Sequence, residues 1–252
     1  MISLHTNETL NSERMFSLLC IIGAAQGLLL FVFLLLKKDR LINLPIIIYV
    51  LITSVELVFQ YIYSEKLIFQ FPHLLYLTEP FSMLGGVLIY AYVRNIFSGR
   101  FVSRKTDLLL FIPFLLYLGY YFPSYFQSAE DKIFDITAFY SNGISWNENL
   151  TEWFFEVMVT LPFLFVSLKK LNTYHASIKN SFSNISKLNY LVVKKLIYFA
   201  ILLYLFEFAL VLLLFFEVGV ADILNNLVYV LSTIIVYVIG YDALVKRHTE
   251  LV

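Results

Sequence analysis

The amino-acid sequence predicts an all-α, polytopic membrane protein. Sixty per cent of its 252 residues are hydrophobic and only 14 per cent are charged, whereas a soluble domain carries about 25 per cent charged residues. The mean hydropathy is +0.79. A chain of this length cannot bury so much apolar surface in a core of its own, so lipid is its expected solvent. The lone cysteine, Cys20, excludes an intrachain disulfide.

Seven apolar segments are long enough, or nearly so, to cross a hydrocarbon core of about 30 Å as helices. These segments are residues 15–36, 44–63, 74–96, 108–122, 153–168, 193–216 and 223–245. The fourth is short, and the fifth contains Pro162. We expect a polar N-terminal segment over 1–14, a seven-helix domain over 15–245 and a cytoplasmic end over 246–252.

The distribution of basic residues predicts the orientation, because cytoplasmic loops are rich in Lys and Arg. Of the 18 Lys and Arg residues, all but Arg14, Lys66 and Lys132 fall on one side of the seven-span arrangement. The other side has an acidic loop between the fourth and fifth spans. The N-terminus is therefore predicted to lie outside and the C-terminus in the cytoplasm.

Three carboxylates fall within predicted spans: Glu56, Glu79 and Glu207. A charged group at the centre of a membrane helix costs about 2.5–3.5 kcal/mol on the insertion scale, so such groups usually face a cavity or a partner. Glu156 lies in the fifth predicted span, nearer its outer edge. The predicted topology places all four in the outer half of the membrane.

Polar residues recur at helical spacing in three of the spans, so that each set shares one helix face. The sets are Tyr49, Thr53, Glu56, Gln60 and Tyr63; Tyr76, Glu79, Gly86 and Tyr90; and Asp222, Asn226, Tyr229, Thr233 and Tyr237. They indicate either one outward-opening ligand cavity or polar contacts that hold buried helices together. The predicted ligand-binding residues are Glu56, Glu79, Glu207, Tyr49, Thr53, Gln60, Tyr76, Asn226, Tyr229 and Thr233. Carboxylates there would bind a cationic group, or donate hydrogen bonds when protonated.

Small residues predict close helix packing at two places. Gly23 and Gly27 flank Gln26 in "GAAQG", and this small-xxx-small spacing lets a neighbouring backbone approach closely, within or between protomers. Gly86 in the third span favours the same interpretation. We expect Gln26 to serve packing rather than ligand binding.

Enzyme and metal functions find no support in the sequence. It has no HExxH, GxSxG or phosphate-binding glycine loop. Its four histidines are scattered along the chain and across both predicted sides of the membrane, which argues against a metal cluster. The sequence therefore predicts no catalytic residues, no metal and no cofactor.

Four collinear segments carry a resemblance to a known family. They are "IIGAAQGLLLFVFLLLKKDR" (21–40), "PFSMLGGVLIYAYVRNIFSGR" (80–100), "DLLLFIPFLLYLGYYFPSYFQSAEDK" (107–132) and "NSFSNISKLNYLVVKKLIYFAI" (180–201). In order and spacing they resemble the N-terminal membrane region of AraC-type transcriptional regulators from Bacteroidota. In that family a "GYxxL" sequence, here "GYDAL" (240–244), leads from helix seven into a helix-turn-helix DNA-binding domain.

The resemblance implies a sensor region in the bacterial inner membrane. The DNA-binding domain is absent from this sequence, so we expect either a fragment of a longer regulator or a stand-alone relative. DNA would be contacted only through such a downstream domain, and a homodimer would match paired DNA half-sites. The alternative is a small carrier in which Glu56, Glu79 and Glu207 relay protons or bind a coupling ion. The resemblance favours the sensor.

The predicted topology can be tested by cysteine labelling in intact cells. A membrane-impermeant reagent should modify a cysteine placed at residue 135 and should leave one at residue 248 unmodified until the cells are lysed. Labelling of residue 248 from outside would refute the orientation.

Overall fold

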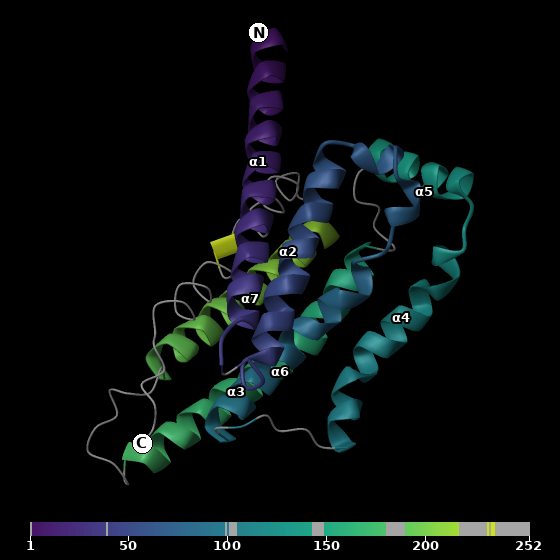
Figure 1. The fold of residues 1–252 in the computed structure, drawn as a ribbon. Coiled ribbons are helices and arrows are strands. Elements are labelled where there is room, and N and C mark those ends of the chain that lie inside the picture. The colour runs from purple at the N-terminus through teal and green to yellow at the C-terminus, as the bar shows by residue number, and fades with distance from the viewer. Residues whose placement is uncertain are drawn as a thin grey trace.

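The computed structural model describes residues 2–38, 40–98, 100, 105–142, 149–179, 190–216, 231, 233 and 234. This part of the chain is all-α, which confirms the predicted class (Figure 1). Its helices are α1 (Ile2–Leu35), α2 (Leu44–Ser64), α3 (Gly85–Ser98), α4 (Ile112–Tyr125), α5 (Ala129–Asn142), α6 (Asn149–Lys179) and α7 (Tyr190–Phe215). Short 3₁₀ segments are η1 (Leu67–Phe69), η2 (Pro72–Leu74), η3 (Glu79–Leu84) and η4 (Lys105–Phe111).

Helices α1 and α2 form an antiparallel hairpin on one side of the molecule (Figure 1). The two helices meet through Cys20 and Ala24 of α1 and Leu57 of α2, all buried. The small side chains on α1 let the two helices lie close together. The opposite face of α1 exposes large apolar side chains, as a lipid-facing surface requires. Among them are Leu18, Ile22, Leu29, Val32 and Phe33.

Helices α3, α6 and α7 pack together and form most of the apolar core with α2. The backbones of α3 and α6 approach each other closely at Gly86. A Cβ atom added at Gly86 would lie 2.9 Å from both the Cα atom and the carbonyl oxygen of Thr160. Only a residue without a side chain lets the two backbones come this close. At the other end of α3, the buried Asn95 donates a hydrogen bond to the carbonyl oxygen of Ile42, at 3.3 Å.

The third predicted span is not one regular helix. The chain turns at Tyr76, which has a φ of 67°, and then forms η3 before α3 begins at Gly85. Pro72 and Pro80 each stand in the first turn of a 3₁₀ segment, where the missing N–H needs no partner. The prediction that Tyr76 shares one helix face with Glu79 and the residues of α3 was therefore wrong. The spacing of residues 74–96 was counted as if the segment were one regular helix. Such a count cannot detect a residue in the left-handed conformation, here Tyr76, that interrupts the helix.

Helix α4 stands apart from the rest of the bundle and contacts η3 (Figure 1). An ion pair anchors the start of η4 to α3: the Arg94 guanidinium donates to the Asp107 carboxylate at 2.6 Å. Both side chains are partly shielded from solvent. The faces of α4 are largely exposed, which is consistent with lipid as the surrounding medium.

Helix α5 was not predicted; the sequence suggested only an acidic loop. Ser128 accepts a hydrogen bond from the backbone N–H of Asp131 at 3.2 Å, which caps the helix. Glu130 and Asp131 stand in the first turn, where the helix dipole favours negative charge. The helix packs on η1 and η2 and buries Lys132 and Ile136.

Among the described residues, five helical stretches are long and apolar enough to cross a membrane, which indicates a multi-pass membrane protein. They are Arg14–Leu35, Leu44–Ser64, Pro72–Ser98, Asp107–Tyr125 and Val193–Leu213, and they correspond to the predicted spans one, two, three, four and six. The fifth predicted span, 153–168, lies within α6, whose 31 residues would extend about 46 Å. Of the seventh, 223–245, only residues 231, 233 and 234 are described.

The contact between α3 and α6 predicts a matched pair of variants. Gly86→Ala should destabilise the protein by about 1–3 kcal/mol, because the added methyl group forces the two backbones apart. Gly119→Ala on α4 should be neutral or stabilising by up to about 1 kcal/mol, because nothing lies within 4 Å of its Cβ position and Ala favours helix. Thermal unfolding of both variants in lipid nanodiscs measures the difference. Equal behaviour of the two would contradict the assigned packing.

Candidate functional site

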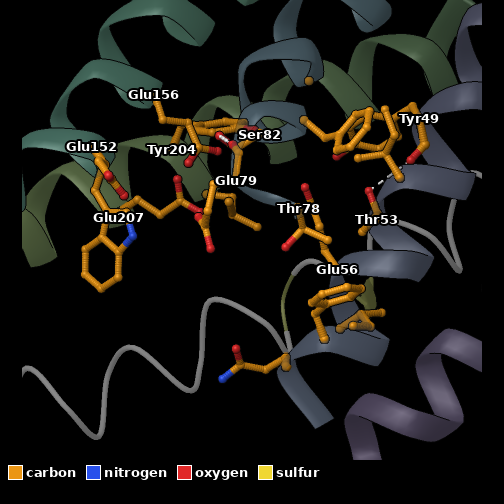
Figure 2. Close-up of a pocket in the computed structure, with 18 of the residues that line it drawn as sticks. Tyr49, Thr53, Glu56, Thr78, Glu79, Ser82, Glu152, Glu156, Tyr204 and Glu207 are labelled. Carbon is orange, nitrogen blue, oxygen red and sulfur yellow. Dashed lines mark hydrogen bonds between the residues drawn. The ribbon is translucent and has the colours of Figure 1, made fainter. Parts of the chain in front are cut away.

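A cavity of about 180 Å³ lies between α2, η3, α3, α4, α6 and α7 (Figure 2). This is far more than the 10–15 Å³ that one water needs. Its polar lining residues are Tyr49, Thr53, Glu56, Gln60, Tyr63, Thr78, Glu79, Ser82, Tyr117, Glu152, Trp153, Glu156, Tyr204 and Glu207. The cavity therefore joins segments that are far apart in the sequence.

Five glutamates define this site, here called the glutamate cavity: Glu56, Glu79, Glu152, Glu156 and Glu207. Figure 2 shows them arranged around one space, carried by four different segments. Glu56 comes from α2 and Glu79 from the first residue of η3. Glu152 and Glu156 come from the start of α6, and Glu207 from the second half of α7. The cavity thus collects acidic groups from α2, η3, α6 and α7, whereas α3 and α4 line it without contributing one.

Helical spacing explains how each segment presents its part of the lining. On α2, Tyr49, Thr53, Glu56, Gln60 and Tyr63 follow one another at steps of three or four residues and so share one face. Glu152 and Glu156 are four apart on α6, and Tyr204 and Glu207 are three apart on α7. Each pair occupies one helix face for the same reason.

The charges of the lining are unbalanced. None of the described residues that line the cavity is Lys, Arg or His. Glu152 accepts a hydrogen bond from the hydroxyl of Tyr121. Within the described part of the chain, no hydrogen bond or ion pair links Glu56, Glu79, Glu156 or Glu207 to another side chain through its carboxyl group. Because carboxylates away from bulk water require a compensating partner, this arrangement leaves room for a cation.

The hydroxyl groups of the cavity divide into two kinds. Thr53 donates to the carbonyl oxygen of Tyr49 at 3.1 Å, and Ser82 donates to that of Glu79 at 2.9 Å, so both are engaged within their own helices. The Tyr117 hydroxyl is buried and has no hydrogen-bond partner among the described residues. Tyr204 is 7 % exposed and its hydroxyl lies against Gly85 at the cavity wall. Two phenol groups of the lining therefore have no hydrogen-bond partner among the described side chains.

Hydrogen bonds donated by two tyrosines connect helix α5 to segments beside the cavity. Tyr140 of α5 donates to the carbonyl oxygen of Tyr63 at 2.5 Å, and Tyr63 lines the cavity. Burial raises the pKa of Tyr140 to about 12, so its hydroxyl keeps its proton at neutral pH and remains a donor. Tyr76 donates to Asp135 of α5 at 3.3 Å, and its ring packs on Tyr121 at 5.3 Å. Helix α5 is thus connected, through the rings of Tyr76 and Tyr121, to the hydrogen bond that Tyr121 donates to Glu152.

The structure brings together six of the predicted ligand-binding residues: Tyr49, Thr53, Glu56, Gln60, Glu79 and Glu207. Tyr76 does not line the cavity and instead donates a hydrogen bond to Asp135 of α5. Thr233 also lies elsewhere, because its methyl group would be 2.6 Å from a Cβ atom at Gly23 of α1. Asn226 and Tyr229 lie outside the described residues.

Several lining residues were missed by the prediction, chiefly Glu152, Glu156, Ser82 and Tyr204. The two α6 glutamates were assigned to the acidic loop and to the membrane edge. Their spacing of four residues at a helix start was a signal that could have joined them to one face. Tyr204 stands three residues before Glu207, which was another such signal, although tyrosine is abundant throughout the chain with 18 copies.

The residues predicted for packing have different surroundings. Gly86 lies against α6, and Gly23 lies against Thr233 and Leu57. Gly27 is buried, whereas Gln26, which lies between Gly23 and Gly27 in the sequence, is exposed on the surface of α1. Gln26 therefore does not pack within the described part of this protomer.

No protein family, curated protein or solved structure matches the chain. Within the described residues, no three His, Cys, Asp or Glu side chains lie close enough together to hold one metal ion. Among the described residues, the functional evidence therefore lies in the glutamate cavity.

Replacing a cavity glutamate by glutamine should change the stability in opposite directions in two cases. If the glutamates form a ligand site, stability should rise; if they only hold the helices together, it should fall. Without ligand, at a pH where the carboxyl groups are ionised, Glu156→Gln should stabilise the protein by about 0.5–2 kcal/mol, because it removes one of five carboxylates that share the cavity without a basic residue among the described lining. Glu130→Gln, an exposed position on α5, is the matched control and should have little effect. Thermal unfolding in nanodiscs gives both values. Marked destabilisation by Glu156→Gln alone would instead favour a role in holding the helices together.

Proposed function

We propose that this chain is a membrane-embedded sensor domain that binds a positively charged ligand in the glutamate cavity. The observation that carries the proposal is the lining itself: five glutamates and no basic residue among the described lining residues. Cavities with a few convergent polar groups on apolar walls are the usual form of small-molecule sites. Charged groups within membrane spans are costly and usually functional. The predicted orientation places the cavity toward the outer face of the inner membrane.

The architecture around the cavity supports a coupling between ligand and helix packing. Helix α7 contributes Tyr204 and Glu207 to the cavity and packs along α6, which contributes Glu152 and Glu156. A ligand that binds one packing of these helices better than another shifts the population toward it. Helix shifts of about 1–2 Å are common in such transitions. In this proposal the signal passes to the cytoplasm through residues 223–245, and any DNA contact belongs to a downstream domain.

A carrier is the second candidate, and one observation favours it. The third span is broken between η2 and η3, and Glu79 is the first residue after the break. Secondary carriers often place their binding sites at discontinuous helices. The resemblance to the membrane region of AraC-type regulators and the lack of a second, matching break in the described helices favour the sensor.

Cation binding should be visible as stabilisation of the purified protein. In nanodiscs at constant ionic strength, phenethylammonium, sodium or calcium chloride should raise the unfolding temperature of the wild type in at least one case, since a ligand that binds only the folded state stabilises it. The double variant Glu79→Gln, Glu207→Gln should lose that response, and Glu130→Gln should keep it. If no cation stabilises the wild type beyond the double variant, the proposed function is wrong.

Transport measurements separate the sensor from the carrier. Sealed vesicles that contain the protein should bind the stabilising cation saturably and should not accumulate it under an imposed pH gradient or membrane potential. Accumulation that depends on Glu79 and Glu207 would establish the carrier instead.

A further inference from the structure

We infer that the ligand of the glutamate cavity is an organic ammonium ion with an apolar group, and not a metal ion. The inference rests on the proposed function and specifies the chemistry of the same site. Three features of the lining carry it: the spread of the carboxyl groups, two tyrosine hydroxyls, and an apolar wall.

The carboxyl groups are too widely spread for a metal ion. Calcium and magnesium bind oxygen ligands at about 2.0–2.6 Å, so several carboxylates must converge on one point. In the described part of the chain no three acidic, His or Cys side chains converge in this way. The five glutamates instead surround a cavity of about 180 Å³. Such an arrangement suits a cation that fills the space and is contacted from several sides.

The tyrosine hydroxyls supply the second, independent indication of a ligand. Tyr204 is 7 % exposed and points into the cavity, where no described side chain forms a hydrogen bond with its hydroxyl (Figure 2). The buried Tyr117 hydroxyl also has no partner in the described chain. A primary ammonium group has three N–H donors. Carboxylate oxygens and phenol oxygens on different walls are suitable acceptors for all three.

Glu156 stands at the electrostatic centre of the site. When ionised, it interacts with Glu56, Glu79 and Glu152, and among charged groups it has the largest electrostatic effect on Glu207. Among charged groups it also has the largest electrostatic effect on Tyr204. An ammonium group beside Glu156 therefore faces the largest number of carboxylates and one of the two open hydroxyls.

The remaining wall of the cavity is apolar and aromatic. It includes Phe59, Phe81, Leu88, Trp153, Leu203 and Leu210. An apolar group on the ligand would bury surface against these side chains, and the faces of aromatic rings attract cations. A metal ion or a small inorganic cation has no apolar group and so buries no apolar surface against this wall. The wall thus favours an amine that carries an alkyl or aryl group.

Trp153 gives a direct reporter of the site. The chain has two tryptophans, Trp146 and Trp153, so Trp146→Phe leaves only the one that lines the cavity. In this background the full-length protein in nanodiscs is titrated with four probes: phenethylamine hydrochloride, ethylamine hydrochloride, 3-phenylpropionate and calcium chloride. Phenethylamine should change Trp153 emission saturably. Ethylamine lacks the aryl group and should bind about tenfold more weakly, whereas calcium and the anionic 3-phenylpropionate should produce no saturable change.

Variants assign the binding to the cavity. Glu156→Gln should weaken phenethylamine binding by about tenfold or more, as expected for loss of a charge-assisted hydrogen bond. Tyr204→Phe removes only a hydroxyl and should weaken it several-fold with the fold intact, so the inference can be tested even if Glu156→Gln folds poorly. Glu130→Gln should bind like the parent.

The measurements distinguish failure of the organic-ammonium inference from failure of the proposed function. Calcium binding as tight as phenethylamine binding, or equal binding of ethylamine and phenethylamine, would overturn the organic-ammonium inference while cation binding and the proposed function stand. Binding of 3-phenylpropionate in preference to phenethylamine would overturn both. If no probe changes Trp153 emission but sodium or calcium still stabilises the protein through Glu79 and Glu207, only the inference falls.

Discussion

The close contact of α3 with α6 at Gly86 and Thr160 sets the geometry on which the cavity depends. Glu79 lies seven residues before Gly86, and Glu156 lies four residues before Thr160. Both glutamates are therefore one or two turns from the point where the backbones touch, toward the same end of the bundle. A side chain at position 86 would move these two segments apart. The contact fixes how near the acidic groups of η3 and α6 can be.

The interruption of the third span serves the same site. Irregular backbone at membrane depth is tolerated only where protein covers it or where it lines a cavity, because lipid offers no hydrogen bonds. Thr78 and Pro80 are buried at the start of η3, and Glu79 between them lines the cavity. Tyr76 adopts a left-handed conformation just before this point and is held by α5 through Asp135. A backbone conformation that is costly for a tyrosine thus lies beside the candidate site, where such conformations often occur.

The lining combines features that lower stability with features that recognise a ligand. Five carboxyl groups in a space away from bulk water repel one another when they are ionised, and they lack cationic partners on the described walls. Proteins tolerate such arrangements where function requires them. The apolar contacts of α2, α3, α6 and α7, which form one continuous core, provide the surrounding stability. The same helices that hold the bundle together also carry the acidic groups, so ligand occupancy and helix packing are physically linked.

The sequence by itself determined the class of the protein and the acidic residues of the helices. The hydrophobic runs located five helical stretches that are able to span a membrane, because composition alone decides whether a helix prefers lipid. The spacing of Tyr49, Thr53, Glu56 and Gln60 placed them on one face of α2, because a regular helix has a fixed period.

Only the tertiary structure decided which faces meet. Periodicity within one helix carries no information about its rotation relative to the next, so Glu152, Glu156 and Tyr204 entered the site only when α6 and α7 were packed against α2. The turn at Tyr76 was likewise hidden, because a single residue with positive φ changes the direction of the chain without changing its hydrophobic pattern. Thr233 has the helical spacing of the polar residues predicted for the seventh span, yet it lies against Gly23 of α1. Glycine has no side chain, so Thr233 can pack closely at this position.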